Sequence, residues 1–137
     1  MNNELLAIVK EQIKTKIVRS HFTNFLVINS TTFLFVSSFL KYEKLLVSLD
    51  SVKPYINFIT LKETPLTINN GLSKMARHYI KDGYLVHVEQ LNNDNILKFT
   101  IRQNRDNQFI DYYLYIELIN KNTNFIITDI NNRILLA

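Results

Sequence analysis

The chain has 137 residues, of which 47% are hydrophobic and 20% are charged, a balance typical of one globular domain and not of a disordered segment. The absence of cysteine excludes disulfides and thiolate metal sites, and no apolar run reaches the roughly 18 residues that span a bilayer. The net charge of +4 favours anionic partners. The many asparagines point instead to AT-rich codon usage, which would raise lysine too and leave an ordinary solvated surface.

The first expected element is an amphipathic helix at about residues 3–18. Asn3 is a suitable N-cap, and Glu4 in the first turn suits the helix dipole. Apolar residues recur at helical spacing, at Leu5, Leu6, Ile8, Val9, Ile13 and Ile17. Because carboxylates interrupt this segment and no cleavage site follows, it is not a signal peptide, and we expect a cytoplasmic location.

Four segments rich in β-branched and aromatic residues follow, with turn-forming residues between them. They predict sequential antiparallel strands at Phe22–Ile28, Thr32–Ser38, Tyr42–Leu49 and Tyr55–Thr60. A second helix is expected after the break at Thr64–Pro65, over Ile68–Lys81, with Gly83 as its C′ residue. Its predicted buried face consists of Leu72, Met75, Ala76, Tyr79 and Ile80.

The last third of the chain has the alternation of strands again. The expected strands are Tyr84–Gln90, Ile96–Arg102, Phe109–Leu118, Phe125–Thr128 and Arg133–Leu136. The fold class is therefore α+β, with two helices packed on antiparallel sheets in a single domain over residues 1–137. The predicted core includes Leu6, Val9, Ile13, Leu72, Met75, Tyr79, Val86, Val88, Leu97 and Phe99.

No motif in the sequence marks a reaction centre. Phosphate-binding and zinc-protease patterns are absent, and His21, His78 and His87 lack the spacing of metal ligands. A three-histidine site assembled in space is the alternative to scattered histidines. We expect no catalytic residue, no metal and no cofactor, and hence a protein that binds. The tyrosine-rich run from Tyr112 to Tyr115 either stacks bases or fills the core, with Tyr113 and Tyr115 sharing a face.

Several strings of the sequence resemble one family. The opening LLAIVKEQIKTKIV and the segment MARHYIKDG at 75–83 are similar to the first helix and to the L-L-R-K-H-L-x-G-G motif of the NFACT family of RqcH- and FbpA-like proteins. VEQLNNDNILKFTI at 88–101 resembles its I-x-Q-x-G-x-D-R-I-L-x-F-x-I. YIELINKNTNFIITDINNRIL at 115–135 resembles its V-E-L-M-G-R-x-S-N-I-I-L-x-D-x-x-G-x-I-L.

The resemblance implies an NFACT-N domain, with a β-sandwich similar to the N-terminal domain of Fpg-type DNA glycosylases. It implies binding to tRNA, with alanine tRNA as the candidate, and to the large ribosomal subunit during alanine tailing of stalled chains. The chain is then expected to be a fragment of a longer protein, with no membrane partner. The alternative is a fibronectin-binding, adhesin-like module, which the missing signal peptide disfavours. Glycosylase chemistry lacks its nucleophile, because no N-terminal proline is present.

The same resemblance places a tRNA-binding site. Asp94 stands at the Asp of the family's D-R pair, Asn95 replaces the Arg, Glu117 and Leu118 match its E-L, and Lys121 follows. Asparagine loses the charge and planar fork of arginine. If the strands on either side of residues 103–108 form a hairpin, we expect Leu118 opposite Asp94 and Glu117 opposite Asn95. The alternative role of Asp94 is to cap its own turn.

Overall fold

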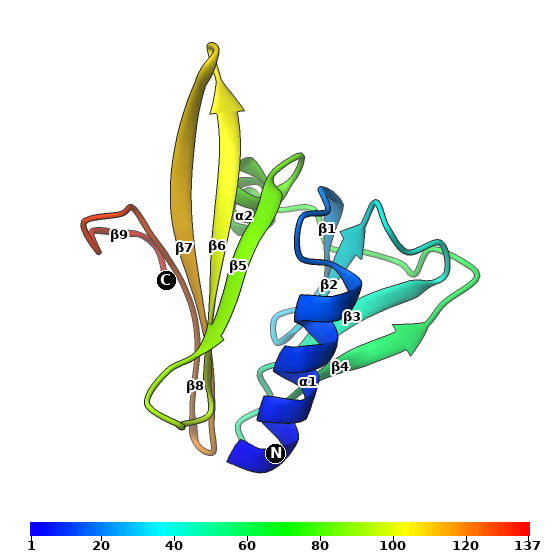
Figure 1. Cartoon of the computed structure of the whole chain (residues 1–137). Coiled ribbons are helices and arrows are strands. Elements are labelled where there is room, and N and C mark those ends of the chain that lie inside the picture. Colours follow the sequence, from blue (N-terminus) through cyan, green and yellow to red (C-terminus); the bar gives the residue numbers. More distant parts are fainter.

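A computed structural model describes the whole chain, residues 1–137, as two antiparallel sheets that face each other (Figure 1). The first sheet holds, in order, β1 (Phe22–Asn29), β2 (Thr32–Ser37), β3 (Glu43–Ser48) and β4 (Tyr55–Thr60). The second holds β5 (Tyr84–Gln90), β6 (Ile96–Arg105), β7 (Gln108–Ile119), β8 (Asn122–Thr128) and β9 (Ile134–Leu136). Every strand pairs with its neighbour in the chain, so both sheets are meanders, as predicted.

Two helices pack on the open sides of this sandwich. The first, α1 (Asn3–Lys16), contacts β4 and β5, and the second, α2 (Gly71–Ile80), contacts β1 and β6 (Figure 1). The α+β class with two helices on antiparallel sheets is thereby confirmed. The likeness to Fpg-type glycosylases stays a prediction. Neither helix has the length and apolar character that a bilayer span requires.

The two sheets are joined at one corner, where the start of β1 meets the start of β5. His21 forms an isolated bridge with Tyr84, and the N–H of Phe22 donates to the carbonyl of Gly83 at 2.8 Å. The N–H of Asp82 returns a bond to the carbonyl of Phe22 at 2.7 Å. These bonds satisfy backbone groups that would otherwise lack hydrogen-bond partners between the sheets.

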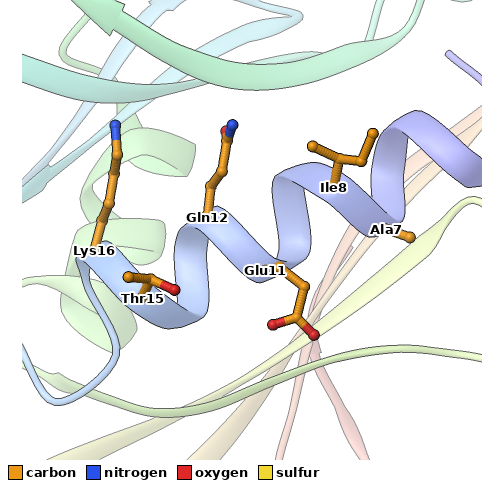
Figure 2. A pocket seen from close by; sticks show the side chains of 6 residues that line it. All are labelled: Ala7, Ile8, Glu11, Gln12, Thr15 and Lys16. Carbon is orange, nitrogen blue, oxygen red and sulfur yellow. The ribbon is translucent and has the colours of Figure 1, made fainter.

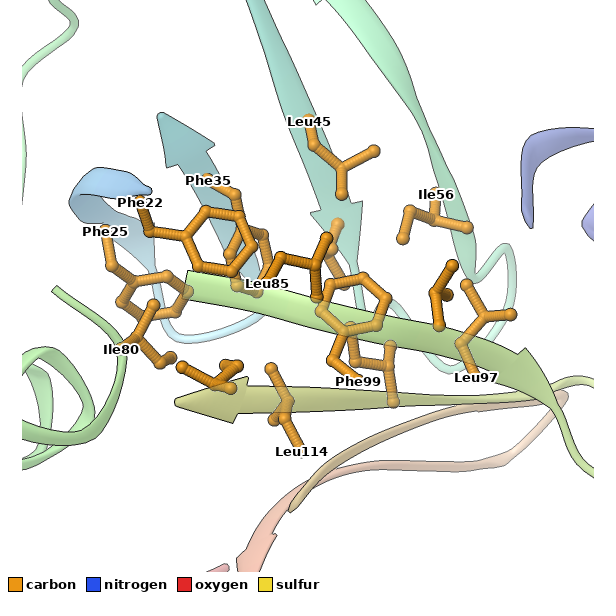
Figure 3. Packing of buried hydrophobic residues seen from close by; sticks show 14 of the residues in the cluster. Phe22, Phe25, Phe35, Leu45, Ile56, Ile80, Leu85, Leu97, Phe99 and Leu114 are labelled. Carbon is orange, nitrogen blue, oxygen red and sulfur yellow. The ribbon is translucent and has the colours of Figure 1, made fainter. Parts of the chain in front are cut away.

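Aromatic side chains from both sheets fill the space between them (Figure 3). The ring centroids of Phe22 and Phe35 lie 5.1 Å apart, and Phe99 of the opposite sheet lies 5.7 Å from Phe35. Such tilted aromatic pairs add to the stabilisation that burial gives the core. Six predicted core residues are confirmed as buried: Leu6, Val9, Ile13, Val88, Leu97 and Phe99.

The predicted buried face of α2 is confirmed for Ala76 and Ile80 and wrong for Leu72 and Met75. Leu72 and Met75 are 59% and 47% exposed, whereas Ala76, Ile80 and Ser73 face the sheets. Ser73 is needed at the helix start, where its hydroxyl accepts the N–H of Asn70 in a capping box. A serine and an alanine also allow the helix to approach the sheets closely, which turns the longer side chains outward. Tyr79 is only partly buried.

A β-bulge changes the expected alternation in β5. The pairing with β6 shifts register between Leu85 and His87, so Leu85 and Val88 both point inward. Val86 is consequently half-buried and not part of the core, which corrects a second prediction. Strict alternation holds only where the ladder is regular.

The N-cap of α1 and the left-handed residue after α2 each differ by one position from the prediction. Asn2, not Asn3, is the N-cap of α1, because its side chain accepts the N–H of Leu5 at 2.9 Å. Beyond α2, Asp82 takes the left-handed conformation with φ 67°, so Gly83 is not required for that purpose. Gly83 instead permits close approach, since a Cβ there would lie 2.6 Å from Cγ2 of Ile101.

The outer strands of the first sheet, β1 and β4, share a local feature. In β1 the side-chain oxygen of Asn24 accepts the N–H of Phe25 at 2.8 Å. In β4 the side-chain oxygen of Asn57 accepts the N–H of Phe58, also at 2.8 Å. One backbone donor in each outer strand is therefore occupied by the preceding side chain.

Candidate nucleic-acid interface

The predicted site lies at the end of the sandwich where the N-terminus meets two turns, at the bottom of Figure 1. The β5–β6 turn brings Asp94 and Asn95, and the β7–β8 hairpin brings Glu117 and Lys121. We call the surface formed by Asp94, Glu117 and Lys121 the turn surface. Hydrogen bonds tie it to the rest of the fold, because the N–H of Lys121 donates to the carbonyl of Ser51 at 2.8 Å.

Asp94 is exposed and belongs to a turn of unusual backbone shape. The two residues before it, Asn92 and Asn93, have φ of 52° and 54°, a region that asparagine tolerates. One carboxylate oxygen of Asp94 accepts the N–H of Asn95 at 2.7 Å. The turn-capping role is therefore real, and it leaves the other carboxylate oxygen without a protein partner.

Asn95 is held by the N-terminus and points away from solvent. Its Nδ2 donates to the carbonyl of Met1 at 2.9 Å, while its Oδ1 is buried and has no partner. An unsatisfied buried acceptor costs about 1–3 kcal/mol. Gln90, a residue that the sequence analysis did not select, supports the same turn by donating to the carbonyls of Asn3 and Asp94 at 3.3 and 2.9 Å. The sequence feature that could have identified Gln90 is its position in the segment 88–101, which resembles the family motif.

The hairpin register differs by one residue from the prediction. Leu118 lies opposite Asn95, to whose carbonyl its N–H donates at 2.7 Å, and Glu117 pairs with Ile96. The cause is the two-residue turn at positions 106 and 107, whose φ angles of 54° and 65° suit a tight hairpin. Leu118 is fully buried and fills the core. Only Glu117 of this pair therefore presents its side chain on the turn surface.

Lys121 supplies the cation of the turn surface. It sits in the β7–β8 turn with φ 67°, its side chain is exposed, and it forms no ion pair. With Asp94 and Glu117 the surface has two carboxylates and one ammonium group. It is thus suited to accept hydrogen bonds from amino and hydroxyl groups more than to hold phosphates.

The outer face of the second sheet carries the tyrosine-rich run. Tyr113 and Tyr115 share this face, and Tyr112 lies buried on the other side, which confirms the predicted alternation. The ammonium of Lys98 lies 3.9 Å from the ring centroid of Tyr113 and 5.6 Å from that of Tyr115. These rings are therefore already engaged in cation–π contacts.

Charged side chains on this face are also paired. Arg102 donates to both carboxylate oxygens of Asp111, at 2.8 and 3.0 Å. This hydrogen bonding, with the Coulombic attraction of the same carboxylate, raises the pKa of Arg102 above its ordinary value. A paired guanidinium is a weaker phosphate ligand than a free one, so this face is a poorer nucleic-acid surface than its composition indicates.

The hollow along α1 is an open helix surface (Figure 2). Its six lining side chains all come from α1: Ala7, Ile8, Glu11, Gln12, Thr15 and Lys16. A hydrogen bond from Lys10, together with its charge, lowers the pKa of Glu11. Lys16 pairs with Glu43 at 2.8 Å. No second element brings a nucleophile or base into this hollow. The chain also contains no cluster of three or more His, Asp or Glu side chains placed to hold a metal ion.

Comparison with known proteins identifies the family of this fold. The family model for the NFACT N-terminal and middle domains matches residues 5–137. No curated protein sequence matches the chain. The N-terminal part of the fibronectin/fibrinogen-binding protein from Streptococcus suis is similar in structure, with a TM-score of 0.90 and 20% identity, over 98% of this chain and 52% of that one.

Two further solved structures have the same fold. The N-terminal domain of the fibronectin-binding protein PavA from Streptococcus pneumoniae has a TM-score of 0.89 and 18% identity, over 98% of this chain and 52% of that one. The fibrinogen-binding protein from Staphylococcus aureus has a TM-score of 0.82 and 17% identity, over 98% and 48%. The chain therefore spans about half the length of these structures.

Proposed function

The chain belongs to the NFACT family, and from that premise we propose that it is a cytoplasmic tRNA- and large-subunit-binding domain of a ribosome quality-control factor. The observation that carries this proposal is the turn surface, where Asp94, Glu117 and Lys121 are presented at one end of the fold. The domain acts by binding and has no chemistry of its own.

The proposed contacts follow from the charges of this surface. The carboxylates of Asp94 and Glu117 accept hydrogen bonds from base amino groups or ribose hydroxyls, and Lys121 approaches a phosphate. Asn95 does not contact the RNA in this arrangement, because its amide is engaged with Met1. Few cations take part, so binding by this chain is weak and decreases with salt.

A tRNA filter-binding titration tests the proposal. Lys121→Glu should weaken binding several-fold and reduce the salt dependence by about one counterion. The double variant Asp94→Ala with Glu117→Ala should also bind less tightly. Lys62→Glu is the matched control, because Lys62 is an exposed and unpaired lysine in the loop before α2. Equal binding by wild type and all variants, with folding retained, would show that the turn surface is structural.

The arginine that the family motif has in place of Asn95 can be introduced, and the variant tested in the same assay. Asn95→Arg should tighten tRNA binding by about 1–3 kcal/mol if a bidentate contact forms. It also removes the bond to Met1, so its melting temperature has to be measured alongside. Co-sedimentation with purified large ribosomal subunits tests the second partner, and the turn-surface variants should sediment less.

A fibronectin-binding role is the second candidate, because two of the similar structures are named fibronectin-binding proteins. It predicts that the chain binds immobilised fibronectin and that the labelled protein is found at the cell surface. Binding to large subunits without binding to fibronectin would reject this candidate. The reverse result would reject the ribosomal one.

A further inference from the structure

The solvent side of α2 carries two apolar side chains that nothing in the chain covers. Leu72 and Met75 are 59% and 47% exposed, and the partly buried Tyr79, whose ring centroid lies 4.9 Å from that of Tyr112, continues their line one turn further along the helix. Residues at this spacing lie on one face of a helix. Single exposed apolar residues are ordinary, but two in line beside a hollow are typical of an interaction site.

Such a hollow opens beside these side chains. A groove of about 300 Å³ lies between α2, the first sheet and β8. Its aromatic part consists of Phe25, Phe33 and Phe125, whose ring centroids are 5.1 to 5.7 Å apart. Leu72 and Ala76 line it from the helix. Ten of its fifteen lining residues are hydrophobic and none has a charged side chain, so it suits an apolar side chain and not a phosphate.

Basic residues lie on the other side of these apolar side chains. Lys74, His78 and Lys81 are exposed, and α2 contains no carboxylate. These basic side chains do not donate to the carbonyls at the C-terminal end of α2. Gln103 already donates to the carbonyls of Tyr79 and Lys81, at 2.9 and 3.0 Å. The two lysines also form no ion pair, so their charges are available to a partner.

We propose that α2 and the adjoining groove form a docking surface for an acidic, amphipathic segment of a protein partner. A bulky apolar side chain of the partner enters the groove, a second packs on Leu72 and Met75, and carboxylates meet Lys74 and Lys81. Binding of an amphipathic helix through apolar anchors is a common mode of recognition, and complementary charges select the partner. This role is separate from the nucleic-acid binding proposed for the turn surface.

A pair of synthetic peptides tests the proposal. Both are helical over about four turns and carry Leu and Phe along one face. One has Glu on the flanks of this face and the other has Lys. In backbone-amide NMR titrations of the chain, the Glu peptide should shift signals of α2 and of the groove, including Ala76 and Phe125. The Lys peptide should bind at least about tenfold more weakly.

Exposed side chains allow variants that keep the fold. Met75→Ser should weaken the Glu peptide about tenfold, and Lys74→Glu with Lys81→Glu should reverse the preference between the peptides. Ile8→Ser is the matched control, because Ile8 is 57% exposed on α1 and should leave peptide binding unchanged. Circular dichroism confirms folding of each variant.

Three outcomes would overturn the proposal. The Glu peptide fails to bind, both peptides bind equally, or the shifted signals lie away from α2 and the groove. A parallel titration with tRNA separates the two macromolecular classes. If tRNA shifts the same α2 amides and displaces the Glu peptide, the surface belongs to nucleic acid and the docking proposal is wrong.

Discussion

The two glycines of the chain should respond to alanine with opposite signs. Gly83 is buried where α2 gives way to β5, and an added Cβ would lie 2.6 Å from Cγ2 of Ile101 and 2.9 Å from Nε2 of Gln103. Ile101 is only 1% exposed and cannot turn into solvent. Gln103 cannot withdraw without losing its bonds to the carbonyls at the end of α2.

The magnitude follows from these two contacts. Overpacking of a well-packed core costs about 1–3 kcal/mol, and loss of a hydrogen bond costs about 1 kcal/mol. Gly83→Ala should therefore lower the free energy of unfolding by about 2–4 kcal/mol. Gly71, by contrast, is the first residue of α2 and has no atom within 4 Å of an added Cβ. Gly71→Ala should raise the free energy of unfolding by about 0.4–1 kcal/mol, because it restricts the unfolded chain.

Urea denaturation followed by circular dichroism measures both variants against wild type. Because the substitution is the same, differences in unfolded-state entropy largely cancel when the two variants are compared. A Gly83→Ala variant as stable as Gly71→Ala would show that β6 moves away from residue 83 at little cost. The close approach would then not be the reason for glycine at this position.

Three further results are expected. Leu97→Ala should cost about 2–5 kcal/mol in urea denaturation, because Leu97 is fully buried; a loss within error would mean that this face of β6 is solvated. Chelator treatment should leave the melting temperature unchanged. A decrease in melting temperature that added zinc reverses would instead support a histidine metal site. The pKa of Glu11, measured by NMR titration, should lie below its ordinary value because Lys10 donates to its carboxylate. Its small contribution to stability is then present above the unfolded-state pKa and lost as the pH falls through the folded-state pKa; an unchanged pKa in Lys10→Met would contradict this.

Periodicity predicted most of the elements because burial on one side imposes it directly. The ladder containing Leu97 and Phe99 is buried on its predicted face. On α1 the structure buries Leu6, Val9 and Ile13, with Ile17 at the C-cap, whereas Leu5 and Ile8 of the predicted apolar stripe are 50% and 57% exposed. For α2 the same periodicity correctly placed Ala76 and Ile80 in the core. It also included Leu72 and Met75, which are exposed, because periodicity does not report the space between helix and sheet.

The site was less predictable than the fold. Matching motifs identified Asp94 and Glu117, which are accessible, but also Leu118, which is buried. Whether Glu117 lies opposite Asn95 or opposite Ile96 depends on the turn geometry at the far end of the hairpin. That turn lies ten residues or more from the site. The link from Asn95 to Met1 joins residues distant in sequence. No local pattern indicates such a contact.

The asparagine side chains that occupy N–H groups in β1 and β4 bear on how this protein behaves when it is concentrated. A strand at the border of a sheet can recruit the same strand from another molecule, and continued recruitment leads to aggregation. Asn24 and Asn57 each fill one donor that such an incoming strand would need. On β1 the border is covered further by α2 and by the N–H of Ile68, which donates to the carbonyl of Val27, so both borders of the first sheet offer an incoming strand fewer partners.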